Sequence, residues 1–257
     1  MARVLCPLPA RDFDPTESAV PWRVLVDAGH EVIFATPDGA PASADDRMVT
    51  GRGLGPWSLV LRAQPRAVAI YEEMRASPAF LAPLSYAQLD VDALDRVADA
   101  LLLPGGHAPG MKVYLESTTL QRLVARFVLD RRPVGAICHG VVLAARSLDE
   151  NGRSVLHGKR ATALLEKQEL LAWRLTQLWL HDYYRTYPQT VQHEVTEALG
   201  SGAFSEGPTA LFRDAPDHLE RGFTVVDGAL VTARWPGDAW RFAHDLATLI
   251  ATRPVAR

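Results

Sequence analysis

The sequence contains few of the residues that define several large classes of protein. Two cysteines, Cys6 and Cys138, are too few for a disulfide scaffold and fit a reducing compartment. No apolar run reaches the length of a transmembrane helix, and the N-terminal stretch soon turns polar and proline-rich, unlike a signal peptide. We therefore expect a cytoplasmic protein with no membrane partner.

Concentrated charge and metal-binding motifs are also missing. The chain carries 27 Lys and Arg against 30 Asp and Glu, a net charge of −3, with no block of one sign. This balance gives no reason to expect a nucleic-acid partner. The histidines lack the spacing of a zinc site, and no phosphate-binding loop or GxGxxG fingerprint occurs. The sequence predicts no metal and no cofactor.

A hydrophobic content of 48% over 257 residues supports one domain spanning 1–257. Apolar runs that end at Pro or Gly alternate with amphipathic stretches, a pattern typical of an α/β protein with a mainly parallel sheet. The expected strands are 3–6, 30–36, 98–103, 134–137 and 160–163, with a hairpin of 223–226 and 229–232 around Asp227-Gly228. The expected helices are 17–28, 67–75, 141–146, 166–173, one that opens with a capping box of Thr118 and Gln121, and one that starts near Pro236.

Two segments depart from this alternation. Residues 41–95 are irregular and rich in Gly, Pro and Ala, and we expect them to pack beside the sheet. Residues 173–222 form an aromatic-rich, largely helical insertion that includes Trp179, Tyr183, Tyr184 and Tyr187. Such aromatics more often pack than line a pocket. If they cover the site, they will change which substrates fit.

Cys138 lies in the segment Ala136-Ile137-Cys138-His139-Gly140, between an expected strand and an expected helix. Small residues on both sides of a nucleophile are typical of a nucleophile elbow, whose sharp turn excludes bulky neighbours. A helix N-terminus next to the thiol is expected to lower its pKa, and His139 could carry a proton. The alternative is that Cys138 is a buried apolar residue, as we expect for Cys6.

Two further segments could contribute to the same site. Pro104-Gly105-Gly106-His107 follows an expected strand, and the ends of neighbouring parallel strands form the ligand crevice of open α/β sheets. Its glycines would let backbone N–H groups approach an oxyanion, although a Gly-Gly pair is often only a turn and His107 only a loop residue. Glu17 either stabilises the dipole of its helix or reaches the crevice as a proton carrier.

Together these motifs resemble one family. Glu17 with Pro21, the Leu-Pro-Gly-Gly-His segment at 103–107 and the Ile-Cys-His-Gly segment at 137–140 are similar to the ThiJ/PfpI superfamily, which is related to class I glutamine amidotransferases. The order and spacing fit over residues 2–249, and the branch of glyoxalase III and heat-inducible chaperones is the most similar. The resemblance implies a flavodoxin-like three-layer sandwich and a homodimer.

The resemblance also implies roles for individual residues. Cys138 would be a thiolate nucleophile with His139 as its partner and Glu17 in contact with the sulfur. The backbone N–H groups of Gly106 and His139 would form an oxyanion site, with Gly105 and His107 beside the substrate.

In the similar branch an acidic residue after the next strand completes a catalytic triad. Alignment through residues 158–162 places Glu169 in that role, with Glu166 as the competitor. Either glutamate could instead be an ordinary solvated helix residue.

The leading functional hypothesis is glyoxalase III activity, the conversion of methylglyoxal to D-lactate without a cofactor. A second hypothesis is a hydrolase or hydratase that acts on an amide, an isonitrile or a glycated adduct, because a thiolate and an oxyanion site would serve there too. A third is a redox sensor or holding chaperone, because a cysteine with a low pKa oxidises readily.

Overall fold

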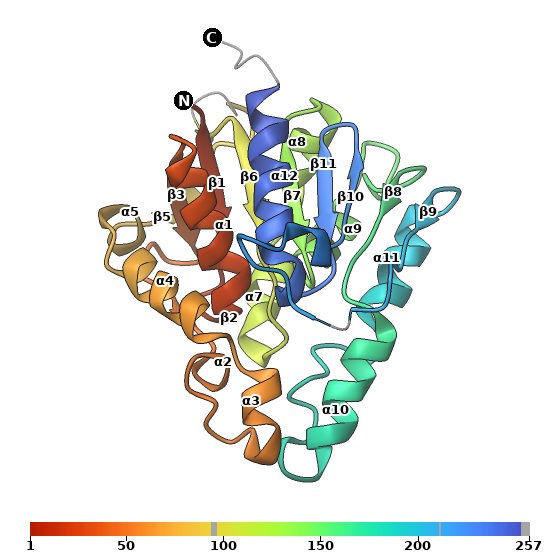
Figure 1. The fold of residues 1–257 in the computed structure, drawn as a ribbon. Coiled ribbons are helices and arrows are strands. Elements are labelled where there is room, and N and C mark those ends of the chain that lie inside the picture. Colours follow the sequence, from red (N-terminus) through yellow and green to blue (C-terminus); the bar gives the residue numbers. More distant parts are fainter. Residues whose placement is uncertain (94–96, 211, 253–257) are drawn as a thin grey trace.

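The computed structural model describes residues 1–93, 97–210 and 212–252. The end of the predicted irregular segment, residues 94 and 95, and the last five residues of the predicted domain lie outside this part. A central sheet lies between two layers of helices (Figure 1). Its strand order is β10-β11-β7-β6-β1-β3-β5, and every neighbouring pair is parallel except β10 with β11. In sequence order these strands are β1 (Arg3–Pro7), β3 (Glu31–Thr36), β5 (Leu84–Ser85), β6 (Ala100–Leu103), β7 (Val134–Ile137), β10 (Thr224–Asp227) and β11 (Leu230–Ala233).

Helices cover both faces of the sheet. The face toward the viewer in Figure 1 carries α1 (Pro15–Asp27), α4 (Pro65–Arg75) and α12 (Ala239–Ala251). The other face carries α7 (Lys112–Leu115), α8 (Thr118–Leu129) and α9 (Gly140–Ala145). The four central strands β1, β6, β7 and β11 are almost entirely buried, as expected for strands covered on both faces. The predicted flavodoxin-like three-layer sandwich is confirmed.

Local capping decides where α1 begins. The side chain of Asp14 accepts hydrogen bonds from the backbone N–H groups of Thr16 at 2.7 Å and Glu17 at 3.1 Å, and Pro15 occupies the first helical position. The helix therefore starts two residues before the predicted Glu17. This start places the Glu17 side chain in the first turn, facing the core.

The predicted capping box at Thr118 is wrong. Ser117 is the N-cap of α8, and its hydroxyl accepts the N–H of Leu120 at 3.3 Å. The side chain of Gln121 turns away and donates to the carbonyl of Leu115 at 3.0 Å. Adjacent Ser and Thr are both good caps, so the sequence does not distinguish them.

The segment after β3 consists of short elements beside the sheet and below it. It contributes an edge strand, β5, to the central sheet, and a second small sheet pairs β2 (Arg11–Phe13) with β4 (Ser43–Ala44). Its other elements are α2 (Asp46–Thr50), η1 (Gly55–Trp57), α3 (Ser58–Leu61), α4, α5 (Pro78–Leu81) and η2 (Tyr86–Gln88). Helices α2 and α3 lie beyond the lower end of the sheet in Figure 1.

The aromatic-rich insertion lies at the same end. Helix α10 (Glu166–Leu180) is longer than the predicted 166–173, and it is followed by α11 (Val191–Leu199). The predicted strand 160–163 is only β8 (Arg160–Ala161), which pairs with β9 (Ala203–Phe204) outside the central sheet. Residues 205–210 and 212–222 are mostly irregular, with the short turns η4 (Leu219–Arg221) and, further on, η5 (Pro236–Asp238) before α12. The predicted hairpin around Asp227-Gly228 is confirmed.

No helix within the described residues is both long and apolar enough to span a bilayer.

Candidate active site

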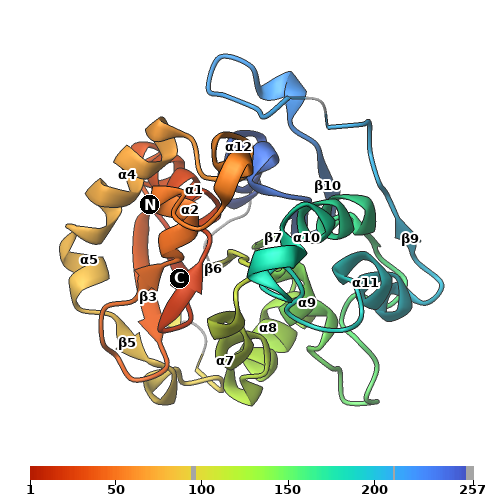
Figure 2. The ribbon, with the colours of Figure 1, turned by 90° about the horizontal axis from the view of Figure 1, so that it is seen from below.

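Three candidate segments meet where neighbouring parallel strands end. Cys138 directly follows β7, the 104–107 turn directly follows β6, and α1 begins a few residues after β1. From β3 to β11 the sheet has the strand order of flavodoxin-like folds, whose ligands bind at the carboxyl ends of the strands beside the switch in strand order. Seen from below in Figure 2, α2, α7 and α10 lie around the ends of β6 and β7.

Cys138 has the backbone of a nucleophile elbow. Its φ is +56°, a left-handed conformation that is uncommon for a residue with a side chain. A Cβ on Gly140 would lie 2.1 Å from the carbonyl oxygen of Leu103, so only glycine fits this close approach to β6. Cys138 is buried, with 5% of the residue exposed. Cys6, by contrast, is fully buried in the core, as predicted.

Glu17 is fully buried and lies against the thiol. Its Oε2 accepts the backbone N–H of Gly105 at 2.9 Å, and its carboxyl group is in side-chain hydrogen-bonding contact with Cys138. Oε1 accepts no N–H or O–H from the described residues. A Cβ on Gly105 would lie 2.7 Å from both Glu17 Oε2 and the backbone N of His139. The glycine therefore lets the carboxylate, the turn and the elbow pack together.

Burial controls protonation in this pair. It raises the pKa of the Glu17 carboxyl well above its ordinary range, and the charge of Asp14 raises it further. Burial also raises the pKa of the Cys138 thiol, and the nearby Glu17 and Asp14 carboxyls add to that rise. The backbone N–H of His139 donates a hydrogen bond to the sulfur, which lowers the thiol pKa. This effect is smaller than the rise caused by burial. The expectation of a lowered thiol pKa is therefore wrong.

His139 is the second partner of the thiol. Its Nδ1 lies 3.5 Å from Cys138 Sγ, and the residue is 1% exposed. Burial lowers the pKa of His139 to about 3, with smaller contributions from His107 and Arg146. The imidazole is therefore neutral at physiological pH.

Thr186 lies against the other ring nitrogen of His139. Its Oγ1 lies 3.1 Å from His139 Nε2 and donates to the carbonyl oxygen of His107 at 2.7 Å. Thr186 was not predicted from the sequence. Thr186 comes from the aromatic-rich insertion, and no spacing relative to Cys138 marks it.

The two glutamates proposed for a triad lie elsewhere. Glu169 is buried, accepts the backbone N–H of Val191 at 2.9 Å and forms an ion pair with Arg185 at 3.6 Å. Glu166 accepts the hydroxyl of Thr190 at 2.8 Å. The structure brings neither carboxylate to His139, so Thr186 stands where the acidic residue was expected.

His107 joins the turn after β6 to the insertion. Its ring stacks on Tyr184, with centroids 4.2 Å apart and planes 14° apart, and meets the edge of Tyr183 at 4.9 Å. Burial lowers the pKa of His107 to about 3, and its Nε2 is buried with no partner among the described residues. The insertion therefore both packs on the site and lines it.

Gly106, with φ +152°, turns the chain beside Asp12 and Asp14, and its role in an oxyanion site stays a prediction.

A cavity of about 600 Å³ opens beside Thr186. Charged residues line much of it, from the start of α2, from α7 and from the insertion. Its lining includes Asp45, Arg47, Lys112, Tyr183 and Thr186. This polar cavity adjoins the candidate site at Thr186, and its lining does not include Cys138, His139 or Glu17.

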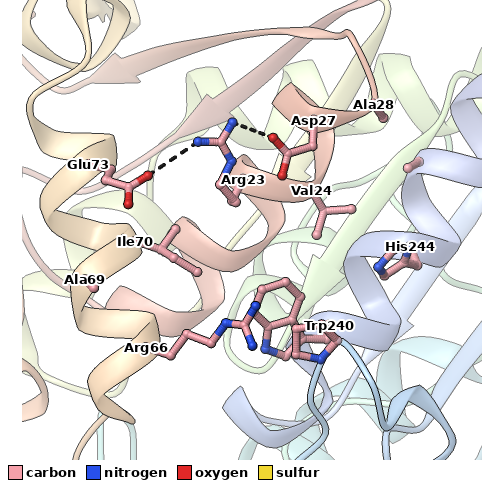
Figure 3. Close-up of a pocket in the computed structure, with 12 residues that line it drawn as sticks. Arg23, Val24, Asp27, Ala28, Arg66, Ala69, Ile70, Glu73, Trp240 and His244 are labelled. Carbon is pink, nitrogen blue, oxygen red and sulfur yellow. Dashed lines mark hydrogen bonds and ion pairs between the residues drawn. The ribbon is translucent and has the colours of Figure 1, made fainter.

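A second cavity, of about 700 Å³, lies between α1, α4 and α12 (Figure 3). There Arg23 bridges Asp27 and Glu73, and Arg66 lies over the ring of Trp240. Its lining includes none of the candidate catalytic side chains. Within the described residues, no group of three or more His, Cys, Asp or Glu side chains is arranged to hold a metal ion.

Two relatives are similar to parts of this chain. DJ-1 homolog D of Arabidopsis thaliana is 30% identical over 160 residues, which are 62% of this chain and 29% of that protein. An uncharacterized protein of Schizosaccharomyces pombe is 31% identical over 121 residues, 47% of this chain and 43% of that protein. Each match therefore spans less than half of the relative's own length.

Solved structures share the fold over nearly the whole chain. Glyoxalase III from Candida albicans superposes with a TM-score of 0.68 at 20% identity, covering 96% of each chain. The rapid encystment protein of Francisella tularensis superposes with a TM-score of 0.70 at 17% identity, covering 97% of this chain and 99% of its own. Drosophila melanogaster DJ-1beta superposes with a TM-score of 0.56 at 20% identity, covering 98% of this chain and 91% of its own.

A family model described as ThiJ/PfpI family-like matches residues 8–200. Because that match covers most of the sequence and includes the elbow, the chain belongs to the ThiJ/PfpI-like family.

Proposed function

We propose that this chain is a cofactor-independent enzyme that converts small 2-oxoaldehydes, such as methylglyoxal, to 2-hydroxy acids, with Cys138 as the nucleophile. One observation carries the proposal: a buried thiol contacts a carboxyl group on one side and a neutral imidazole on the other. The reaction moves protons between two adjacent carbons and their oxygens. It therefore needs two groups that can each give and take a proton.

The first step forms a hemithioacetal. Sγ of Cys138 bonds to the aldehyde carbon while the thiol proton passes to Nδ1 of His139, 3.5 Å away. Glu17, protonated because burial raises its pKa, gives its proton to the carbonyl oxygen. The thiol thus loses its proton during attack, so a raised resting pKa is compatible with catalysis. The backbone N–H of His139 stabilises the charge on sulfur.

The second step exchanges the oxidation levels of the two carbons. The Glu17 carboxylate removes the hydrogen from the former aldehyde carbon, and protonated His139 gives its proton to the ketone oxygen, which yields an enediol. Glu17 then delivers its proton to the second carbon and recovers one from the oxygen on the first. The product is a thioester of the 2-hydroxy acid on Cys138. Water hydrolyses it, and the thiol regains its proton.

One solved structure and the geometry of the site support this reaction class. A solved structure with the same fold is a glyoxalase III. The redox-sensor hypothesis receives less support, because oxidants attack the thiolate and the Cys138 thiol is buried with a raised pKa. Among the described residues, no contact in the site specifically favours the hydrolase hypothesis.

Purified protein incubated with methylglyoxal tests the proposal, with D-lactate as the readout. We expect turnover by the wild type and a loss of about 10²-fold or more in both Cys138→Ala and Glu17→Gln. A wild type that forms no D-lactate above the Cys138→Ala background would refute the proposal. The same preparations offered a panel of amides, isonitriles and glycated adducts would then identify a hydrolase.

A further inference from the structure

The hydroxyl of Thr186 has one hydrogen and two neighbours. At 2.7 Å is the carbonyl oxygen of His107, which can only accept a hydrogen bond. At 3.1 Å is Nε2 of His139, which can donate or accept according to its protonation. Because the single hydroxyl hydrogen is committed to the carbonyl, Thr186 must accept a hydrogen bond from His139.

This count of hydrogens fixes the state of the imidazole. Nε2 of His139 carries a hydrogen, and a neutral imidazole has only one N–H. Nδ1 is therefore unprotonated, and its lone pair faces Cys138 Sγ at 3.5 Å. A ring with its hydrogen on Nδ1 would set an N–H against the thiol and could not take its proton.

We propose that Thr186 is a positioning residue that holds His139 in the Nε2–H tautomer and so makes Nδ1 the base for Cys138. A carboxylate at this place would also favour the protonated imidazolium, whereas a neutral hydroxyl selects the tautomer without adding charge. The assignment of the tautomer rests on hydrogen bonds alone. Its kinetic consequence rests on the function proposed above.

The fold holds Thr186 firmly at this point. Thr186 is 4% exposed, so water has little access to compete for His139. On its N-terminal side, Tyr183 donates to Asp45 and Tyr184 stacks on His107. These contacts fix the path by which the chain leaves α10 and reaches the site.

On its C-terminal side, Tyr187 donates to Glu116 at 2.7 Å and lies under the guanidinium of Arg146 at 4.1 Å. Glu169 holds the next turn through the backbone N–H of Val191. The sequence led us to expect that Glu169 contacts His139. Glu169 instead anchors the segment that carries Thr186, and Thr186 makes the contact with His139.

Thr186→Val and Thr186→Ser separate this role from simple packing. Valine keeps the shape but removes the hydroxyl, and serine restores it. Protein labelled with ¹⁵N-histidine, with a His139→Asn sample to assign the signals, reports which nitrogen of His139 carries the hydrogen. We expect Nε2–H in the wild type and in Thr186→Ser, and a mixture of both tautomers in Thr186→Val.

In turnover of methylglyoxal we expect kcat of Thr186→Val to fall about 10²-fold, the lower range for loss of a positioned base, while KM changes little. Thr186→Ser should recover most of that loss. An Nδ1–H tautomer in the wild type would overturn the proposal even if Thr186→Val did not fold. An unchanged tautomer and kcat in a folded Thr186→Val would overturn it as well.

The proposed activity and the proposed role of Thr186 can be refuted independently. If the wild type has no activity on methylglyoxal but Thr186→Val shifts the tautomer, the substrate is wrong and the positioning role stands. If D-lactate is formed but the tautomer does not depend on the hydroxyl, only the role of Thr186 is refuted.

Discussion

Tyr184 lies face to face on His107, with ring centroids 4.2 Å apart. The two residues come from elements far apart in the sequence, the insertion after β8 and the turn after β6. Because that turn also holds Glu17 through Gly105, the aromatic insertion supports the site as well as covering it. The stack therefore links the aromatic-rich insertion to the part of the chain that carries the proposed chemistry.

Replacing Tyr184 tests this link. Its hydroxyl is buried with no partner among the described residues, so Tyr184→Phe should raise the free energy of unfolding by about 1 kcal/mol by removing an unpaired polar group. Tyr184→Ala removes the ring from the stack and should lower it by about 3 kcal/mol. Urea unfolding of both variants measures the difference. Equal stabilities for Phe and Ala would show that the stack contributes nothing.

Much of the site follows from local sequence, and the rest does not. Cys138 and Gly140 were identified because the geometry of an elbow restricts residues two positions away, and Gly105 because glycine at a strand end lets backbone N–H groups approach an oxyanion. Thr186 could not be found this way. Its role depends on how a long insertion folds back onto the sheet, and a threonine is common in loops. Glu169 was assigned to the site by alignment of a short segment, whereas its buried carboxylate binds the backbone of its own insertion.

The fold was predictable to a similar degree. Buried strands and the Asp227-Gly228 hairpin have strong local patterns, so the sheet was recovered almost completely. The excess length of α10 was missed because two apolar residues, Leu171 and Leu178, are exposed on its outer face, which blurs the helical periodicity.

Gly140→Ala tests the close packing at the elbow. The added Cβ would meet the Leu103 carbonyl at 2.1 Å, a backbone atom that cannot move aside, so we expect a loss of at least about 3 kcal/mol in unfolding free energy. Gly29→Ala is the matched control. Its site has φ +80° and no atom within 4 Å of the added Cβ, so backbone strain alone should cost about 1 kcal/mol. Similar losses in both variants would argue against the steric constraint.

Glu169 should make stability depend on pH. Burial raises its pKa from 4.5 to about 7, so the folded state binds this proton more tightly than the unfolded state. The stabilisation is therefore complete below about pH 4.5 and is lost as pH rises through 7, a change of up to about 3 kcal/mol. Glu169→Gln cannot ionise and should lack this loss.

Urea unfolding of the wild type and Glu169→Gln at pH 5 and pH 8 measures this effect. The comparison at each pH cancels the contributions of other buried carboxyls, such as Asp14 and Asp214, whose pKa values burial also raises. We expect the variant to gain stability relative to the wild type between the two pH values. A constant difference would mean that Glu169 does not titrate in this range.

Arg234 and Asp238 form an ion pair with no solvent exposure, at 2.8 Å, just after β11. The guanidinium also donates to the carbonyl oxygens of Glu206 and Pro208, which anchors the irregular segment before β10 to the sheet. Asp238→Asn leaves a buried cation without its counter-charge, and we expect a loss of about 3–5 kcal/mol in unfolding free energy. Asp130→Asn is the control, because its i,i+4 pair with Arg126 is solvent-exposed and should contribute less than about 1 kcal/mol. If chemical denaturation gave the same small loss for both variants, water would have to reach Arg234, and the segment before β10 would not be held by this pair.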